Sequence, residues 1–141
     1  MTYTWSTGAA AVIEHTDGDW GGIWSLLFAA AKATFRLSLQ LPLGLGAQIA
    51  YTAMDLCDAR DEIGWAHPDL PSTQIAVDLG PLGPVVDAPD ACHVLVDLLD
   101  VILHRLTLLP TNPLDPAGAG LVRTVTTRVR AARAVLAGQR R

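Results

Sequence analysis

Five polar residues follow one another between positions 90 and 104 at spacings of three and four. They are Asp90, His93, Asp97, Asp100 and His104. Residues at these spacings share one face of an α-helix, so the five form a single ridge, the polar stripe. An imidazole one turn from a carboxylate suits a general base or a pair of metal ligands. His93, Asp97, Asp100 and His104 are therefore candidate catalytic residues, and His93, Asp97 and His104 are candidate metal ligands.

Three interpretations of the polar stripe stay open. In the first, it is the solvent-exposed edge of its helix, where His and Asp are ordinary soluble neighbours. In the second, it lines a ligand pocket or metal site that Asp55, Asp58 and Glu62 face from an earlier helix. In the third, its carboxylates pair with arginines near the end of the sequence. A di-iron site is disfavoured, because neither Glu14 nor Glu62 has the His three residues on that such sites use.

Arg60 is a further candidate catalytic residue, because it falls on an otherwise apolar helical ridge. A buried guanidinium needs a carboxylate partner, and we expect Asp97 or Asp100 to provide it. Arg60, the polar Asp61 and His67 also resemble the Arg–polar–His motif of HEPN-type helical ribonucleases, over eight residues. That resemblance implies an RNA-cleaving helical domain. A structural salt bridge and a histidine near a helix end are the alternative.

Trp20 and Trp24 lie one helical turn apart and are followed by Phe28 and Phe35. This pattern is typical of core anchors, or of one wall of an aromatic ligand pocket. The residues that we take as candidates for ligand binding are therefore Trp20, Trp24, Asp55, Asp58, Glu62, His93 and Asp97.

Four segments with a helical period position these residues. Apolar side chains recur every three or four positions over about residues 19–39, 46–66, 87–109 and 115–139. Thr16 and Asp19 resemble a capping box before the first segment, and Asp115 with Pro116 is a typical start for the fourth. Residues 1–16, with Trp5, show little periodicity and are expected to fold over the helices or reach a partner. The pattern predicts an all-α fold, a four-helix bundle formed by one domain over residues 1–141.

The connection between the second and third segments is rich in proline. Residues 68–89 contain five prolines and two glycines, which exclude a long helix. The runs QIAVDL and PVVDA flank GPLG and are compatible with a short β-hairpin. Loops of this length in compact domains are often binding loops.

Composition narrows the classes of function. The net charge of −4 gives no general attraction for nucleic acid or for anionic lipid, so neither is an expected partner. The charge is uneven, with ten acids and one base between Asp55 and Asp100 but six arginines and no acid after Asp115. Two cysteines are too few for a disulfide scaffold. With 50% hydrophobic and only 17% charged residues, part of the apolar surface should be covered by a second subunit.

We therefore expect a small cytoplasmic binding or interaction protein without catalysis of its own. It is expected to be a homodimer that hides part of the third helix or the aromatic face of the first, to bind a protein or small molecule, and to need no cofactor. The Pro-rich loop and the polar stripe are its expected recognition surfaces. The alternative is a small bundle enzyme that uses the stripe for acid–base or metal chemistry, and a HEPN-like ribonuclease ranks third.

Overall fold

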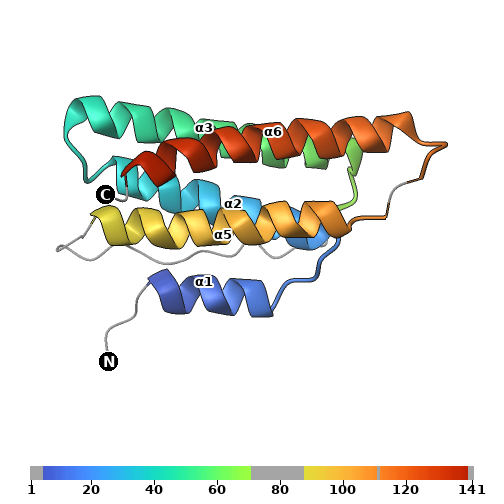
Figure 1. Cartoon of the computed structure of the whole chain (residues 1–141), viewed down its shortest axis with the longest axis horizontal. Coiled ribbons are helices and arrows are strands. Elements are labelled where there is room, and N and C mark those ends of the chain that lie inside the picture. The colour runs from blue at the N-terminus through green and yellow to red at the C-terminus, as the bar shows by residue number, and fades with distance from the viewer. Residues whose placement is uncertain (1–4, 71–87, 111, 140–141) are drawn as a thin grey trace.

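The computed structural model describes residues 5–70, 88–110 and 112–139 of the 141-residue chain. In these residues the chain forms helices and no strand, which confirms the all-α prediction. The helices, labelled as in Figure 1, are α1 (Trp5–Glu14), α2 (Trp20–Ser38), α3 (Leu43–Ala66), α5 (Ala88–Leu108) and α6 (Pro116–Gln139). None of the helices in these ranges is both long enough and apolar enough to cross a membrane.

Four of the helices match the segments predicted from periodicity. The starts and ends of α2, α3, α5 and α6 lie within three residues of the expected bounds. The largest difference is at α3, which begins at Leu43 directly after Pro42 instead of near Gly46. The suggested β-hairpin falls on residues 71–87, outside the described part of the chain.

The four long helices form a closed ring around the core. α2 packs on α3, α3 on α6, α6 on α5, and α5 on α2, while α1 lies outside the ring against α5 and, less extensively, α2 (Figure 1). Burying a branched apolar side chain contributes about 1.5–3 kcal/mol, so the completely buried residues stabilise the ring. They are Ile23, Leu26, Leu27, Leu37, Ile49, Leu56, Ile63, Leu95, Leu98, Leu99 and Ile102.

The helix α1 was not predicted, so the described residues hold five helices where four were expected. One face of α1 is buried through Trp5, Gly8, Ala9 and Val12. Trp5, which was expected to fold over the helices or to reach a partner, packs into the core and is only 6% exposed. At ten residues this helix is shorter than the window of about 11–18 residues over which a helical period is usually recognised in a sequence.

The turn between α1 and α2 is closely packed. Asp19 is the N-cap of α2, and its Oδ1 accepts a hydrogen bond of 2.8 Å from the Gly22 N–H. The expected capping box with Thr16 does not form, because the Thr16 hydroxyl donates to the Val12 carbonyl at 2.8 Å and so closes α1. A Cβ at position 22 would lie 1.7 Å from the Asp17 carbonyl oxygen, so this turn requires glycine.

Arg105 of α5 holds the C-terminal end of α1. Its Nη1 donates to the Thr16 hydroxyl at 2.7 Å and the Asp17 carbonyl at 2.9 Å, and its Nη2 donates to the Ile13 carbonyl at 2.9 Å. Terminal carbonyls lack partners within their own helix, and a cation is favoured at the negative end of the helix dipole. Burial lowers the pKa of Arg105, while the carboxylates of Asp17 and Asp19 act in the opposite direction.

Candidate functional site

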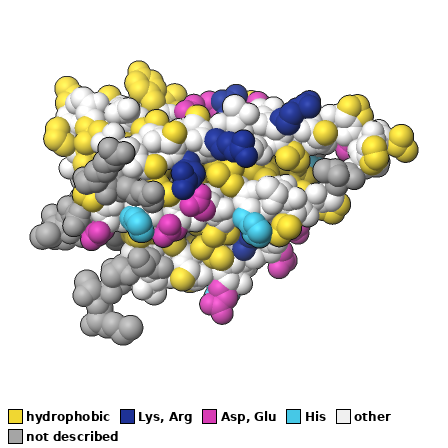
Figure 2. Space-filling view, in the orientation of Figure 1, with side chains coloured by type: hydrophobic (Ala, Val, Ile, Leu, Met, Phe, Trp, Pro, Cys, Tyr) yellow, Lys and Arg dark blue, Asp and Glu magenta, His cyan; other side chains and the backbone are white. Residues whose placement is uncertain are grey.

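The polar stripe lies on the exposed edge of α5, next to the arginines of α6 (Figure 2). His93 Nε2 is 3.9 Å from Asp97 Oδ2, and the two side chains are 61% and 67% exposed. Asp100 binds Arg133 of α6, with 3.3 Å between its Oδ2 and Nη2 and a second contact from Nε. This hydrogen bond to Asp100 raises the pKa of Arg133. The stripe therefore combines the first and third interpretations, an exposed edge with a salt bridge to the last helix.

Asp58 and Glu62 of α3 face α6 and do not face the polar stripe. Arg128 Nη1 is 3.7 Å from Asp58 Oδ2, and Arg128 Nη2 is 3.9 Å from Glu62 Oε1. Asp55 is half-buried on the same helix. Within the described ranges, no group of three His, Cys, Asp or Glu side chains is arranged to hold a metal ion. Metal binding by His93, Asp97 and His104 stays a prediction, because the described structure does not bring these three side chains together around one point.

Arg60 does not pair with Asp97 or Asp100, so that prediction is wrong. Its Nη2 is 3.1 Å from Oδ1 of the neighbouring Asp61, and its guanidinium lies 5.5 Å from the centre of the Phe28 ring. The reason is geometric, because both α5 carboxylates point outward from their helix and Asp100 is engaged by α6. The resemblance to the HEPN-type motif stays a prediction. His67 packs against Trp20 at the end of α3 in a tilted ring contact, with 5.7 Å between the ring centres.

A groove runs between α2 and α3, and we call it the α2–α3 groove. Trp24 stacks on Phe28 beside it, with ring centres 5.6 Å apart. Burial raises the pKa of the Cys57 thiol on the other wall, while Arg60 acts to lower it. The groove has a volume of about 280 Å³, and its lining is mostly apolar: Phe28, Ala31, Lys32, Phe35, Ala53, Met54, Cys57 and Arg60.

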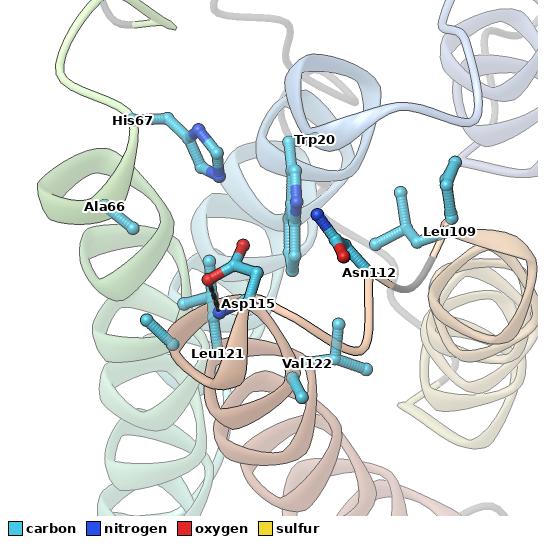
Figure 3. Close-up of a pocket in the computed structure, with 12 residues that line it drawn as sticks. Trp20, Ala66, His67, Leu109, Asn112, Asp115, Leu121 and Val122 are labelled. Carbon is cyan, nitrogen blue, oxygen red and sulfur yellow. Dashed lines mark hydrogen bonds between the residues drawn. The ribbon is translucent and has the colours of Figure 1, made fainter.

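A second cavity, the terminal pocket, lies where α2 and α6 begin and where α3 and α5 end (Figure 3). Its volume is about 300 Å³. Trp20 comes from the first turn of α2 and His67 from the end of α3, while Asn112 and Asp115 come from the connection between α5 and α6. The remaining lining residues are Ala66, Leu109, Pro110, Ala117, Gly118, Ala119, Leu121 and Val122.

Polar groups converge on one side of the terminal pocket. Figure 3 shows the Trp20 indole between the His67 ring and the Asn112 amide, with the Asp115 carboxylate facing the same space. Asp115 is the N-cap of α6, as predicted, because its Oδ1 accepts the Gly118 N–H at 3.0 Å. The Asn112 Oδ1 accepts the Leu114 N–H at 2.9 Å. These bonds fix both side chains and leave the Asp115 Oδ2 and the Asn112 NH₂ group directed to the pocket side.

The sequence indicated only part of this pocket. Trp20 was a candidate ligand-binding residue, whereas His67 was considered for another role and Asp115 only as a helix cap. Asn112 carried no signal in the sequence, because the pocket is formed by three chain segments that only the fold brings together. No protein family matches the sequence, and comparisons with curated proteins and with solved structures find no similar protein.

Proposed function

We propose that this protein is a non-catalytic binding module that acts as a homodimer. In this proposal α2, α3, α5 and α6 serve as a four-helix bundle, α1 is an added helix, and the two subunits meet through α2 and α3. The observation that carries the proposal is a set of large apolar side chains exposed on these two helices, which we call the α2–α3 patch. It consists of Phe35, Leu39, Leu43, Tyr51 and Met54, which are between 50% and 90% exposed.

The members of the α2–α3 patch are close enough to act as one surface. Phe35 and Met54 line the α2–α3 groove together, and Leu39 and Leu43 flank the turn that joins the two helices. Figure 2 shows hydrophobic side chains gathered at this end of the molecule. Soluble monomers rarely expose apolar patches larger than a few hundred Å², so a partner surface is the expected cover. On α5, by contrast, the one large apolar side chain that is mostly exposed in the described range is Leu108.

The charges beside the patch favour a second copy of the chain as the partner. α2 carries Lys32 and Arg36, while α3 carries Asp61 two turns beyond Met54. A two-fold axis along the α2–α3 groove places α2 of one subunit over α3 of the other at the same height. Lys32 shares the groove with Arg60, so this operation brings it near the level of the partner's Asp61. Each subunit then supplies both the basic and the acidic side of the contact.

The polar stripe would remain uncovered in such a dimer and is available to a protein partner. It lies on α5 beside α6, away from the α2–α3 patch. The alternative of an enzyme draws less support, since His93 and His104 are exposed on one helix edge and the described residues bring no three candidate ligands together.

The dimer is tested by measuring the mass of the protein in solution with light scattering over a range of concentrations. We expect twice the 15.0 kDa of the chain, and a shift toward the monomer in a Leu39→Gln variant. Leu108→Gln is the matched control, because Leu39 and Leu108 are 70% and 66% exposed and only Leu39 belongs to the patch. A wild-type monomer at micromolar concentration, or equal effects of the two substitutions, would refute the proposal.

A further inference from the structure

The terminal pocket lies at the opposite end of the helices from the α2–α3 turn, so the proposed dimer leaves it open (Figure 1). We propose that the terminal pocket binds a small aromatic cation, a flat apolar ring that carries an amidinium or ammonium group. The proposal rests on the size of the pocket, on its single carboxylate and on the indole that forms its wall. It does not depend on the oligomeric state.

The size and lining of the terminal pocket suit a small, flat, mostly apolar molecule. Its volume of about 300 Å³ is at the lower end of the range for ligand pockets in proteins. Leu109, Leu121 and Val122 supply an aliphatic surface, and Trp20 supplies an aromatic one. A ring can therefore be buried against these side chains, while polar groups of the ligand face Asn112 and Asp115 as Figure 3 shows.

The charge of the lining selects a cation. Among the residues that the structure describes, Asp115 is the one acidic residue that lines the pocket, and no lysine or arginine lines it. Because the Asp115 Oδ1 is held by the Gly118 N–H, its carboxylate is fixed in place and its Oδ2 can accept a hydrogen bond from a ligand. Position 118 must be small for this, since a Cβ there would lie 2.6 Å from that Oδ2. Hydrogen bonds from a cationic donor to a carboxylate are roughly twice as strong as neutral ones.

The start of α6 does not reverse this preference. A helix N-terminus carries roughly half a positive charge and by itself favours anions. Here the Asp115 carboxylate already occupies that position with a full negative charge, so the balance beside the pocket is negative. The Trp20 indole adds to the attraction, because tryptophan is the side chain whose ring face attracts cations most strongly.

Benzamidinium is the probe, with benzoate and neutral benzamide as comparators of nearly the same shape. Binding is followed by NMR through the indole N–H signals of the four tryptophans, with the Trp20 signal assigned from a Trp20→Phe variant. We expect benzamidinium to shift the Trp20 signal in a saturable way with a dissociation constant of about 1 mM or below, as fits a fragment-sized ligand. Benzamide should bind more weakly, and benzoate should not bind.

Asp115→Asn isolates the charge of the pocket from the fold. Asparagine caps helices as well as aspartate does, so the variant should keep α6 intact while it removes the negative charge. We expect it to weaken benzamidinium binding at least tenfold. Asp19→Asn is the matched control, because Asp19 caps α2 in the same way but does not line the pocket. Trp20→Phe should weaken benzamidinium binding by a smaller factor than Asp115→Asn does. Because this variant lacks the Trp20 indole signal, its binding is followed through the NMR signals of the other residues that line the pocket.

The proposal is overturned if benzamidinium causes no saturable change at Trp20, if benzoate binds as tightly, or if the two Asp→Asn variants behave alike. A loss of binding confined to Asp115→Asn, with unchanged thermal unfolding in both variants, supports it. None of these outcomes depends on the mass of the protein, so a failed dimer test and a failed ligand test are distinguishable.

Discussion

Replacing Arg105 with methionine should release α1 from the rest of the molecule. Methionine keeps an unbranched apolar stem but removes the hydrogen bonds to the carbonyls of Ile13, Thr16 and Asp17 and to the Thr16 hydroxyl. A hydrogen bond from a charged group contributes about 1.5–3 kcal/mol where it is protected from water. Arg105 is partly exposed, and water can replace some of its bonds, so we expect a total loss of about 2–3 kcal/mol.

This loss should be concentrated in α1, because α1 packs mainly on α5 and lies outside the ring of long helices. Urea unfolding should show the reduced free energy, and the melting temperature should fall by roughly 6–10 °C. The exchange of the backbone amide hydrogens of α1 with solvent should become roughly 30- to 140-fold faster. This factor is the loss of about 2–3 kcal/mol converted into a change in the opening equilibrium, at about 1.4 kcal/mol for each factor of ten.

Arg130→Met is the control for the Arg105 experiment, because Arg130 is an exposed arginine on α6. Its unfolding free energy should stay within about 0.5 kcal/mol of the wild type, as for ordinary surface substitutions. The reasoning would be refuted if Arg105→Met behaved like this control, or if the exchange of the α1 amides did not rise.

Three further predictions follow from the packing and exposure of individual residues. Gly22→Ala should destabilise the protein by about 1–3 kcal/mol in thermal unfolding, since its Cβ would meet the preceding turn, whereas Gly138→Ala, with open space around it, should be neutral or stabilise by up to about 1 kcal/mol. Burial raises the pKa of the Cys92 thiol above its ordinary 9.0. The buried neutral thiol therefore contributes its full stability below pH 9.0, and this contribution is lost as the pH rises further. The free energy of unfolding should fall less steeply above pH 9.0 in Cys92→Ala than in the wild type. His93→Ala and His104→Ala should each change the free energy of unfolding by less than about 0.5 kcal/mol. Neither substitution should reduce zinc binding measured by calorimetry, and a reduction in either variant would support the metal hypothesis.

The long helices could be predicted because each has its own local signal. In α6, Val125, Val129, Ala132 and Leu136 recur at spacings of three and four, and all are buried. Pro68 and Pro110 follow the ends of α3 and α5, as expected of a residue that cannot continue a helix. Such signals lie within a few helical turns of the sequence and do not depend on contacts with distant segments.

The helix α1 could not be predicted, because the side chain that anchors it lies far from it in the sequence. The hydrogen bonds that end it come from Arg105, 88 to 92 residues further along the chain. Arg60 shows the same limit for side chains. Its ridge position indicated a buried partner, but a long flexible arginine can reach Asp61 and the Phe28 ring at the groove instead. Periodicity places a residue on a face and does not choose between the partners available there.

The candidate site shows how much of a pocket the sequence carries. Trp20 could be singled out by its aromatic spacing, and Asp115 by its position before Pro116. Their juxtaposition with His67 and Asn112 depends on the connection between α5 and α6 and on how α3 ends against α2, which no local pattern encodes. The polar stripe gave the opposite result, a strong local pattern whose residues the fold leaves on an exposed edge.

The clamp by Arg105 also constrains the order of events during synthesis. Residues 5–14 leave the ribosome before the other described helices, yet their anchor is made 88 to 92 residues after the carbonyls that it binds. At a translation rate of about 5–20 residues per second, this helix waits roughly 5–20 seconds before it can dock. During that time its apolar face, with Trp5, Ala9 and Val12, is open to chaperones and to neighbouring nascent chains. The helix α1 therefore gains its anchor only after α2, α3 and most of α5 have been synthesised.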